Sequence, residues 1–124
     1  MRLFVDDIRV APEGWVLSRT ITEAIRILAT QKVEEVSLDH DIAYMDERGK
    51  FSGKCSQENY SAVAWYIREI PLDHRPRRVY VHTANPDGFR NIESILKGYT
   101  DVIRDASYAS EWFALPTRRE DYLA

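Results

Sequence analysis

The chain has 124 residues, enough for one hydrophobic core and too few for two independently stable domains, so we expect a single domain over residues 1–124. Its formal net charge of −3 argues against bulk electrostatic binding to duplex DNA. The single cysteine, Cys55, excludes an intrachain disulfide and favours a reducing compartment, so we expect a cytoplasmic protein. No apolar run is long enough for a signal peptide or a membrane span, and we expect no contact with a membrane.

The first third of the chain alternates between strand and helix patterns. Residues 2–5 form a short β-prone run that ends abruptly at an aspartate pair, and residues 15–20 predict a second strand. The pattern at Thr20 and Glu23 is a capping box, and it opens a predicted helix over residues 20–30. The connection between the first two strands is too short for a helical crossover, so the second strand follows an extended loop or pairs antiparallel.

The middle of the chain begins with a third predicted strand at residues 34–38. Glycines and charges predict an exposed loop over residues 43–58, and helical spacing of apolar residues predicts a helix from about Ser56 through Ile70. The basic run at residues 74–78 contains a proline and is interpreted as a solvated connector.

Residues 77–86 predict the fourth strand, which ends in polar residues. Asn85 and Pro86 are a favourable N-cap and first-turn pair for the next helix, which Gly98 would end. Residues 100–106 predict a last strand, and a short helix around residues 112–113 would follow. This alternation predicts an α/β sandwich with a largely parallel sheet.

Three predicted strands end in polar clusters. In an open parallel sheet, ligands bind beyond the carboxyl ends of the strands, so these clusters should surround one crevice. Crowded carboxylates repel each other, and a divalent cation relieves the repulsion. The clusters are Asp6-Asp7, Asp39-His40-Asp41 and His82-Thr83-Ala84-Asn85.

Oxygen-rich clusters of this kind suit Mg²⁺ or Mn²⁺, with Asp6, Asp7 and Asp39 as ligands beside a substrate phosphate. Zinc stays open as an alternative, although the compact His/Cys spacing of most zinc sites is missing. His40 and His82 suit proton transfer near neutral pH.

Each of these residues also has a purely structural interpretation. An aspartate pair often caps a turn, Asn85 can serve only as a helix cap, and Thr83 can satisfy backbone groups. Arg9 is either a solvated loop cation or a clamp for an anion. The convergence of the three clusters favours the functional interpretation.

At these positions the sequence resembles the receiver-domain superfamily, and more closely its branch of cyclic-phosphate processing receiver domains. The resemblance rests on "LFVDDIR", "EEVSLDHDIA" and "VYVHTANP", in this order. It implies a three-layer, flavodoxin-like sandwich with a mainly parallel five-stranded sheet in the order 2-1-3-4-5. It also implies that Asp6 and Asp7 bind metal, that Asp39 matches the phosphoacceptor and that Thr83 matches the hydroxyl residue.

Two departures from ordinary receivers bear on function. The first crossover helix is reduced or missing, and the last strand is followed by Arg104 and Asp105 where a receiver has a lysine. A phospho-switch is therefore less expected. The additional polar residues favour hydrolytic chemistry instead; they are His40, Asp41, His82 and Asn85.

Our leading hypothesis is a metal-dependent phosphoesterase that processes a cyclic phosphate, in a cyclic nucleotide or at an RNA end with a 2',3'-cyclic phosphate. Asp39 would activate a water or attack phosphorus directly. The alternatives are a non-catalytic signalling or binding module that senses metal, phosphate or nucleotide, and an interaction protein with a solvated acidic edge. The expected catalytic residues are Asp39, His40, His82 and Thr83, the substrate-binding residues are Arg9, Thr83 and Asn85, and the metal ligands are Asp6, Asp7, Asp39 and Asp41.

Overall fold

The computed structural model describes residues 1–45, 51–83 and 85–105, with residues 43–45 and 51–58 described by their backbone alone. This part of the chain forms seven strands and three helices. In chain order they are β1 (Arg2–Val5), β2 (Val16–Ser18), α1 (Ile21–Thr30), β3 (Glu35–Leu38), β4 (Asp41–Met45), β5 (Phe51–Asn59), α2 (Ser61–Glu69), β6 (Arg78–Val81), α3 (Pro86–Leu96) and β7 (Asp101–Arg104).

Five strands form one sheet in the order β2-β1-β3-β6-β7. All neighbours in this sheet are parallel, including β2, whose direction the sequence left open. Counted along the chain within this sheet, the order is the predicted 2-1-3-4-5. Residues 6–15 join β1 to β2 without a helix, so the predicted loss of the first crossover helix is also confirmed.

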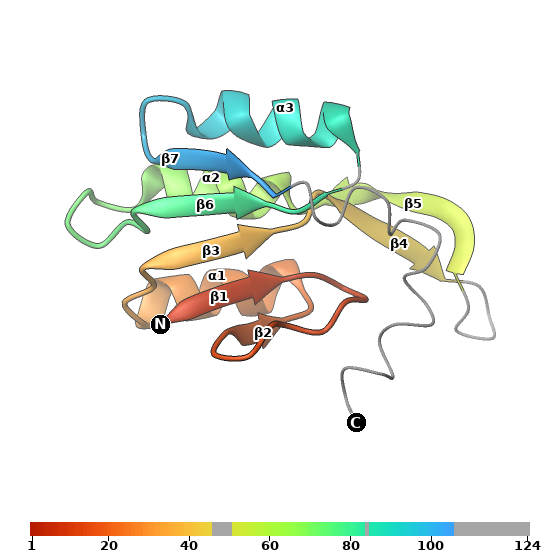
Figure 1. Ribbon diagram of the computed structural model, residues 1–124, viewed down its shortest axis with the longest axis horizontal. Helices are drawn as coiled ribbons and strands as arrows, with labels where there is room; N and C mark the ends of the chain where they lie inside the picture. The colour runs from red at the N-terminus through yellow and green to blue at the C-terminus, as the bar shows by residue number, and fades with distance from the viewer. Residues whose placement is uncertain (46–50, 84, 106–124) are drawn as a thin grey trace.

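The three helices of the described residues lie on one face of the sheet, because each crossover moves the chain across the sheet in the same direction (Figure 1). α1 packs against α2, and α2 packs against α3. The described residues therefore form two layers. A third layer was predicted and would cover the opposite face of the sheet, where the described residues place no helix. The short helix predicted around residues 112–113 lies outside the described residues.

Alternate side chains of the central strands form the core between sheet and helices, as strand geometry requires. The neighbouring residues of these strands point to the opposite face, where Phe4, Ser37 and Tyr80 are in register. The buried core consists of Leu3, Val5, Ala24, Leu28, Val33, Val36, Leu38, Tyr60, Val63, Ala64, Ile67, Ile70, Val79, Val81, Ile92, Ile95 and Leu96.

The predicted exposed loop over residues 43–58 is wrong for its described part, which belongs to an antiparallel hairpin of β4 and β5. The hairpin extends beyond the carboxyl end of the main sheet (Figure 1). Its register shifts twice, so the alternation of polar and apolar residues that reveals a strand is broken. Residues 46–50 lie outside the described residues.

The hairpin also corrects the start of α2, which begins at Ser61 rather than near Ser56, because β5 continues to Asn59. The Asn59 side chain accepts a hydrogen bond from the Ser61 backbone N–H at 2.9 Å, which marks the transition from strand to helix. Within the described residues, no helix combines the length and apolarity needed to cross a bilayer.

Two predicted helix caps are confirmed. Thr20 Oγ1 accepts the Glu23 N–H at 3.0 Å, and Asn85 Oδ1 accepts the Asp87 N–H at 3.0 Å. After α3, Gly98 has a φ of +84°, a left-handed conformation that glycine adopts without a steric penalty. The Asn85 cap begins α3 directly after the polar end of β6, so it places this helix beside the crevice.

Candidate functional site

The three predicted polar clusters meet at the carboxyl edge of the sheet because β1, β3 and β6 are neighbours in matched register. Val5, Leu38 and Val81 are aligned across these strands. The next residues of the strands are Asp6, Asp39 and His82, so their side chains come together. The backbone pairing continues one step past the strands, since Asp39 N–H bonds to Val5 O and His82 N–H to Leu38 O, each at 3.1 Å.

Asp6, Arg9, Asp39 and His82 form what we call the inner cluster, and all four are buried. One oxygen of each carboxylate is held by the backbone. Asp6 Oδ1 accepts the N–H groups of Ile8 at 2.8 Å and of Arg9 at 2.9 Å, and Asp39 Oδ1 accepts the His40 N–H at 2.8 Å. The loop after β1 therefore wraps around the Asp6 side chain, and both carboxylates turn their second oxygen toward the cluster.

The inward oxygens are bridged by Arg9. Its Nη1 lies 2.9 Å from Asp6 Oδ2 and 3.4 Å from Asp39 Oδ2, with only 2% of the arginine exposed. His82 Nε2 lies 2.9 Å from the same Asp6 oxygen. The inner cluster thus combines two carboxylates, one guanidinium and one imidazole in a site shielded from water.

Burial and charge separate the two carboxyls. Burial by itself would raise the pKa of Asp6, but hydrogen bonding to His82 and the charge of Arg9 outweigh it and hold this pKa below its usual range. Burial raises the pKa of Asp39 well above its usual value, and the negative charge of Asp6 adds to the rise despite Arg9. Asp6 is therefore the ionised member, and Asp39 binds a proton more readily. Such a separation is typical of carboxyl pairs with different roles in acid–base chemistry.

His82 is held as a neutral hydrogen-bond donor. Burial lowers the pKa of its imidazole, so the ring is uncharged near neutral pH. Because Asp6 is ionised, we assign the ring proton to Nε2, which donates to Asp6 Oδ2. Nδ1 then accepts from Ser37 Oγ at 2.7 Å, and the ring stacks on Phe4 at 4.4 Å between centroids.

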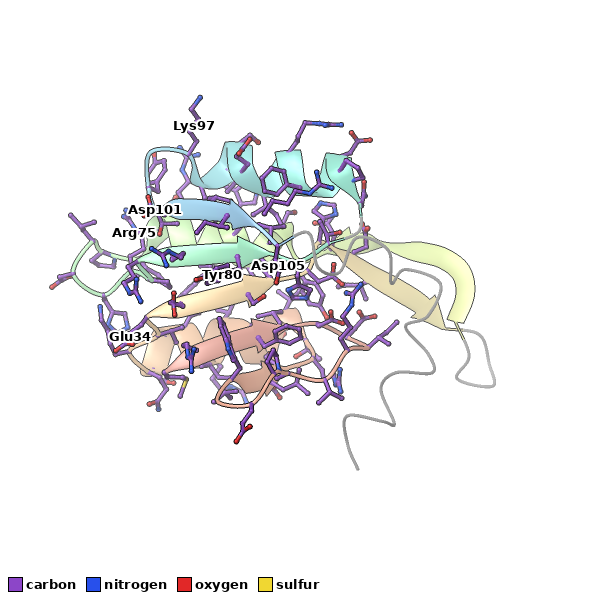
Figure 2. All side chains as sticks on the ribbon, viewed as in Figure 1. Glu34, Arg75, Tyr80, Lys97, Asp101 and Asp105 are labelled. Atoms are coloured by element: carbon purple, nitrogen blue, oxygen red, sulfur yellow. The ribbon has the colours of Figure 1, made fainter. Side chains whose placement is uncertain are left out.

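Ser37 is a site residue that the sequence analysis missed. Its signal was a hydroxyl between the apolar residues Val36 and Leu38 of a fully buried strand, at a position that faces away from the helices. A hollow of about 200 Å³ on that face is lined by Ser37, Phe4, Trp15, Pro12, Tyr80 and Asp105. Tyr80 and Asp105 are labelled on β6 and just past β7 in Figure 2. Ser37 therefore lines the hollow and also hydrogen-bonds to His82.

A second group, which we call the outer cluster, consists of His40, Asp41, Asn85 and Asn91. His40 Nδ1 lies 2.8 Å from Asp41 Oδ1, and Asn91 Nδ2 lies 3.0 Å from His40 Nε2. Asn85 Nδ2 donates to Asp41 Oδ2 at 3.2 Å. Burial alone would raise the pKa of Asp41, but these hydrogen bonds from His40 and Asn85 lower it. Both ring nitrogens of His40 are therefore occupied within the protein.

Gly88 on α3 lets the helix approach the His40 ring closely. A Cβ atom at this position would lie 2.6 Å from His40 Cγ, closer than real Cβ contacts permit. The outer cluster consequently acts as a contact between the β3–β4 connection and α3.

The remaining predicted residues lie close to the two clusters. Thr83 is buried, and its Oγ1 accepts the Asn85 N–H at 3.1 Å. Asp7 is half-buried, and its charge adds to the rise that burial causes in the pKa values of Asp39 and Tyr60. Tyr60 is a second residue that the sequence analysis did not assign to the site, because its helical spacing indicated only a core position. Its hydroxyl donates to Arg19 O at 2.7 Å.

The inner cluster has the donors that a divalent cation requires. One ligand atom each from Asp6, Asp39 and His82 lies within 4.8 Å of the others, and all three residues are buried. Burial raises the pKa of Asp39, the negative charge of Asp6 raises it further, and a bound cation would favour the ionised carboxylate against both effects. Asp7 and Asp41 were also expected among the ligands; neither belongs to this group of three, and Asp41 lies in the outer cluster.

Comparison with known proteins agrees with this geometry. Residues 1–98 match the family model of the cyclic-phosphate processing receiver domain, a span that contains both clusters and every strand of the sheet except β7. Searches of curated proteins and of solved structures gave no match. Because the family model spans most of the chain, this protein belongs to the family of cyclic-phosphate processing receiver domains.

Proposed function

We propose that the chain is a metal-dependent phosphoesterase that hydrolyses a cyclic phosphate, either in a cyclic nucleotide or at an RNA end with a 2',3'-cyclic phosphate. The observation that supports this most directly is the inner cluster, in which two carboxylates with opposite pKa shifts share one buried arginine. A buried guanidinium next to an acid–base pair is suited to phosphoryl chemistry.

Arg9 and Thr83 would hold the phosphoryl oxygens. The planar guanidinium of Arg9 matches two phosphate oxygens at once. Thr83 Oγ1 accepts a backbone N–H from Asn85, so its own hydrogen can be donated. Both groups favour the extra negative charge that develops on the phosphoryl oxygens in the transition state.

Asp39 would carry the reactive oxygen. Its Oδ1 is fixed by the His40 N–H, whereas Oδ2 faces the centre of the cluster. In one route Asp39 takes a proton from water, the water oxygen bonds to phosphorus, one ring P–O bond breaks, and the leaving ester oxygen receives the proton from Asp39. In the other route Oδ2 bonds to phosphorus as one ring P–O bond breaks, and the leaving oxygen takes a proton from water. A water molecule then hydrolyses the acyl phosphate and restores the Asp39 carboxylate. Acid quenching and mass spectrometry of the peptide with Asp39 would detect the covalent adduct only in the second route.

Asp6 and Asp39 would hold the metal, and His82 would join them through Nε2 with its ring proton moved to Nδ1, which would then donate to Ser37 Oγ. A bound divalent cation would polarise a phosphoryl oxygen and stabilise the charge that develops on it. Carboxylate ligands suit Mg²⁺ and Mn²⁺, and the imidazole nitrogen makes Mn²⁺ the better fit of the two.

Incubation of the purified protein with 2',3'-cyclic nucleotides, cyclic dinucleotides and RNA ends that carry a cyclic phosphate tests the proposal. We expect ring opening of one of these classes with Mn²⁺ or Mg²⁺ and its loss with a chelator. If the protein binds one of these compounds but turns over none of them, the enzymatic proposal is contradicted.

One observation favours a non-catalytic binding module as the second candidate. Both ring nitrogens of His40 and of His82 already have hydrogen-bond partners within the protein, so neither imidazole is poised to exchange a proton with a ligand. Saturable binding of a cyclic nucleotide that persists over hours without product would establish this candidate.

A further inference from the structure

The place of Arg9 in the inner cluster conflicts with simple addition of a metal. Asp6 Oδ2 and Asp39 Oδ2 are the oxygens that both carboxylates turn inward, and Arg9 Nη1 contacts both of them. A divalent cation held by the same oxygens would lie against the guanidinium. Because like charges repel strongly in a buried site, the two cations are poorly compatible.

The hydrogen bonds of Asp6 strengthen this conflict. Its Oδ1 already accepts two backbone N–H groups, so Oδ2 is the oxygen left for the cluster. That oxygen accepts from Arg9 and lies at hydrogen-bond distance from His82. A metal bound at Asp6 Oδ2 would therefore compete with these two partners, and displacement of Arg9 would remove the like charge as well.

We infer that Arg9 is the internal counter-ion of the inner cluster, and that a divalent metal displaces its guanidinium, which then binds the phosphate of the substrate. The inference rests on the proposed function for the metal and the phosphate. Without metal, the guanidinium of Arg9 supplies the positive charge that balances the carboxylates. With metal bound, the metal supplies that charge and the guanidinium binds the substrate phosphate.

The backbone around Arg9 suits such an exchange. The Arg9 N–H is held by Asp6 Oδ1 at 2.9 Å, and Arg19 Nη1 donates to the Arg9 carbonyl oxygen at 2.6 Å. Arg19 also donates to the Asp6 carbonyl oxygen at 3.3 Å, so the whole turn is anchored. Rotation about the side-chain bonds of Arg9 can move the guanidinium while the backbone stays in place.

The first experiment follows the Arg9 side chain of the wild-type protein by ¹⁵N NMR during titration with Mg²⁺. We expect its Nε–Hε signal, assigned with Arg9→Lys, to shift with the same midpoint as metal binding measured by calorimetry. Arg26 on α1 is exposed and serves as internal control, and its signal should stay in place. An unchanged Arg9 signal at saturating Mg²⁺ would overturn the exchange.

The second experiment compares the affinities of variants for Mn²⁺ and inorganic phosphate. Arg9→Gln should bind Mn²⁺ at least about tenfold more tightly than the wild type, whereas Arg26→Gln, with the same loss of charge, should stay within about twofold. With Mg²⁺ present, Arg9→Gln should bind phosphate at least about fivefold more weakly than the wild type. If Arg9→Gln does not fold, the wild-type NMR titration decides the question.

The outcomes separate the exchange from the proposed function. Equal Mn²⁺ affinities of the wild type and Arg9→Gln would overturn the exchange, while metal-dependent turnover would still support the phosphoesterase. Failure of both proteins to bind any divalent cation would overturn the exchange and the metal requirement together.

Discussion

Residues 39–41 are consecutive in the chain, yet they divide between the inner and the outer cluster. The two clusters differ in charge and burial. Asp39 joins the inner cluster, whose side chains are almost completely shielded from water, while His40 and Asp41 join the outer cluster at its rim. The inner cluster has a carboxyl with a strongly raised pKa. In the outer cluster, the carboxyl of Asp41 has a lowered pKa and its hydrogen bonds are satisfied.

Backbone direction causes this difference. Asp39 continues the line of β3 beyond the sheet, beside the ends of β1 and β6, whereas Asp41 begins β4 and leaves toward the hairpin. Adjacent polar residues at the end of a strand can therefore have different roles. Here the inner cluster holds two carboxyls whose pKa values are shifted in opposite directions, and the outer cluster attaches α3.

Among the variants of the two clusters, Asp39→Asn in the inner cluster should have the largest effect on turnover. We expect turnover to fall by roughly a thousandfold or more, because the reactive oxygen is lost. Stability without metal should not fall near neutral pH. The raised pKa of Asp39 means that ionisation destabilises the fold as pH rises above its usual value of 3.8, and asparagine removes this cost. Turnover assays with urea unfolding test both parts, and full activity of the variant would remove Asp39 from the mechanism.

Asp6→Asn should have the largest effect on stability. It leaves the buried Arg9 without its closest charge partner, a loss worth about 3–5 kcal/mol in buried ion pairs. Asp41→Asn in the outer cluster is the matched control and should cost only about 1 kcal/mol. Because the pKa of Asp6 is lowered, its contribution is present above pH 3.8 and is lost as pH falls below that value. Urea unfolding at several pH values measures it, and equal losses in both variants would contradict the contrast.

Gly88→Ala tests whether the outer cluster attaches α3. The added methyl group would overlap the His40 ring, and we expect a loss of about 1–3 kcal/mol as helix and ring move apart. Glu93→Ala on the exposed side of the same helix is the control and should change the unfolding free energy little. Thermal unfolding measures this loss. If Gly88→Ala is as stable as the wild type, α3 and the His40 ring can move apart without a loss of stability.

Asn91→Ala should have the smallest effect. It removes the partner of His40 Nε2 from an exposed position, so stability should change by no more than about 0.5 kcal/mol. If the outer cluster is structural, turnover and its pH dependence should also stay the same. A pH profile that shifts by a unit or more would instead show that His40 takes part in proton transfer.

Several features of the site were predictable because they depend on local chemistry. The alternation of strand and helix patterns predicted a largely parallel sheet, and its common carboxyl edge predicted that the clusters with Asp6, Asp39 and His82 would meet. The caps at Thr20 and Asn85 were predictable for the same reason, since each needs only a side chain and a backbone N–H a few residues away.

The partners within the site could not be predicted in this way, because they depend on contacts between distant segments. Ser37 bonds to His82 across 45 positions of the sequence, and Asn91 reaches His40 across 51. The hairpin was missed because its irregular register breaks the alternation that indicates a strand.

The sequence by itself thus determined the order of the elements of the main sheet and its helices, and which polar residues follow each of the three central strands, since periodicity and capping act within a few residues. Only the tertiary structure decided how those residues divide into two clusters. The direction of the chain after β3, the approach of α3 at Gly88 and the position of Arg9 between two carboxylates determine burial and charge. Those two quantities, which no short stretch of sequence contains, give Asp39 a raised pKa and Asp41 a lowered one.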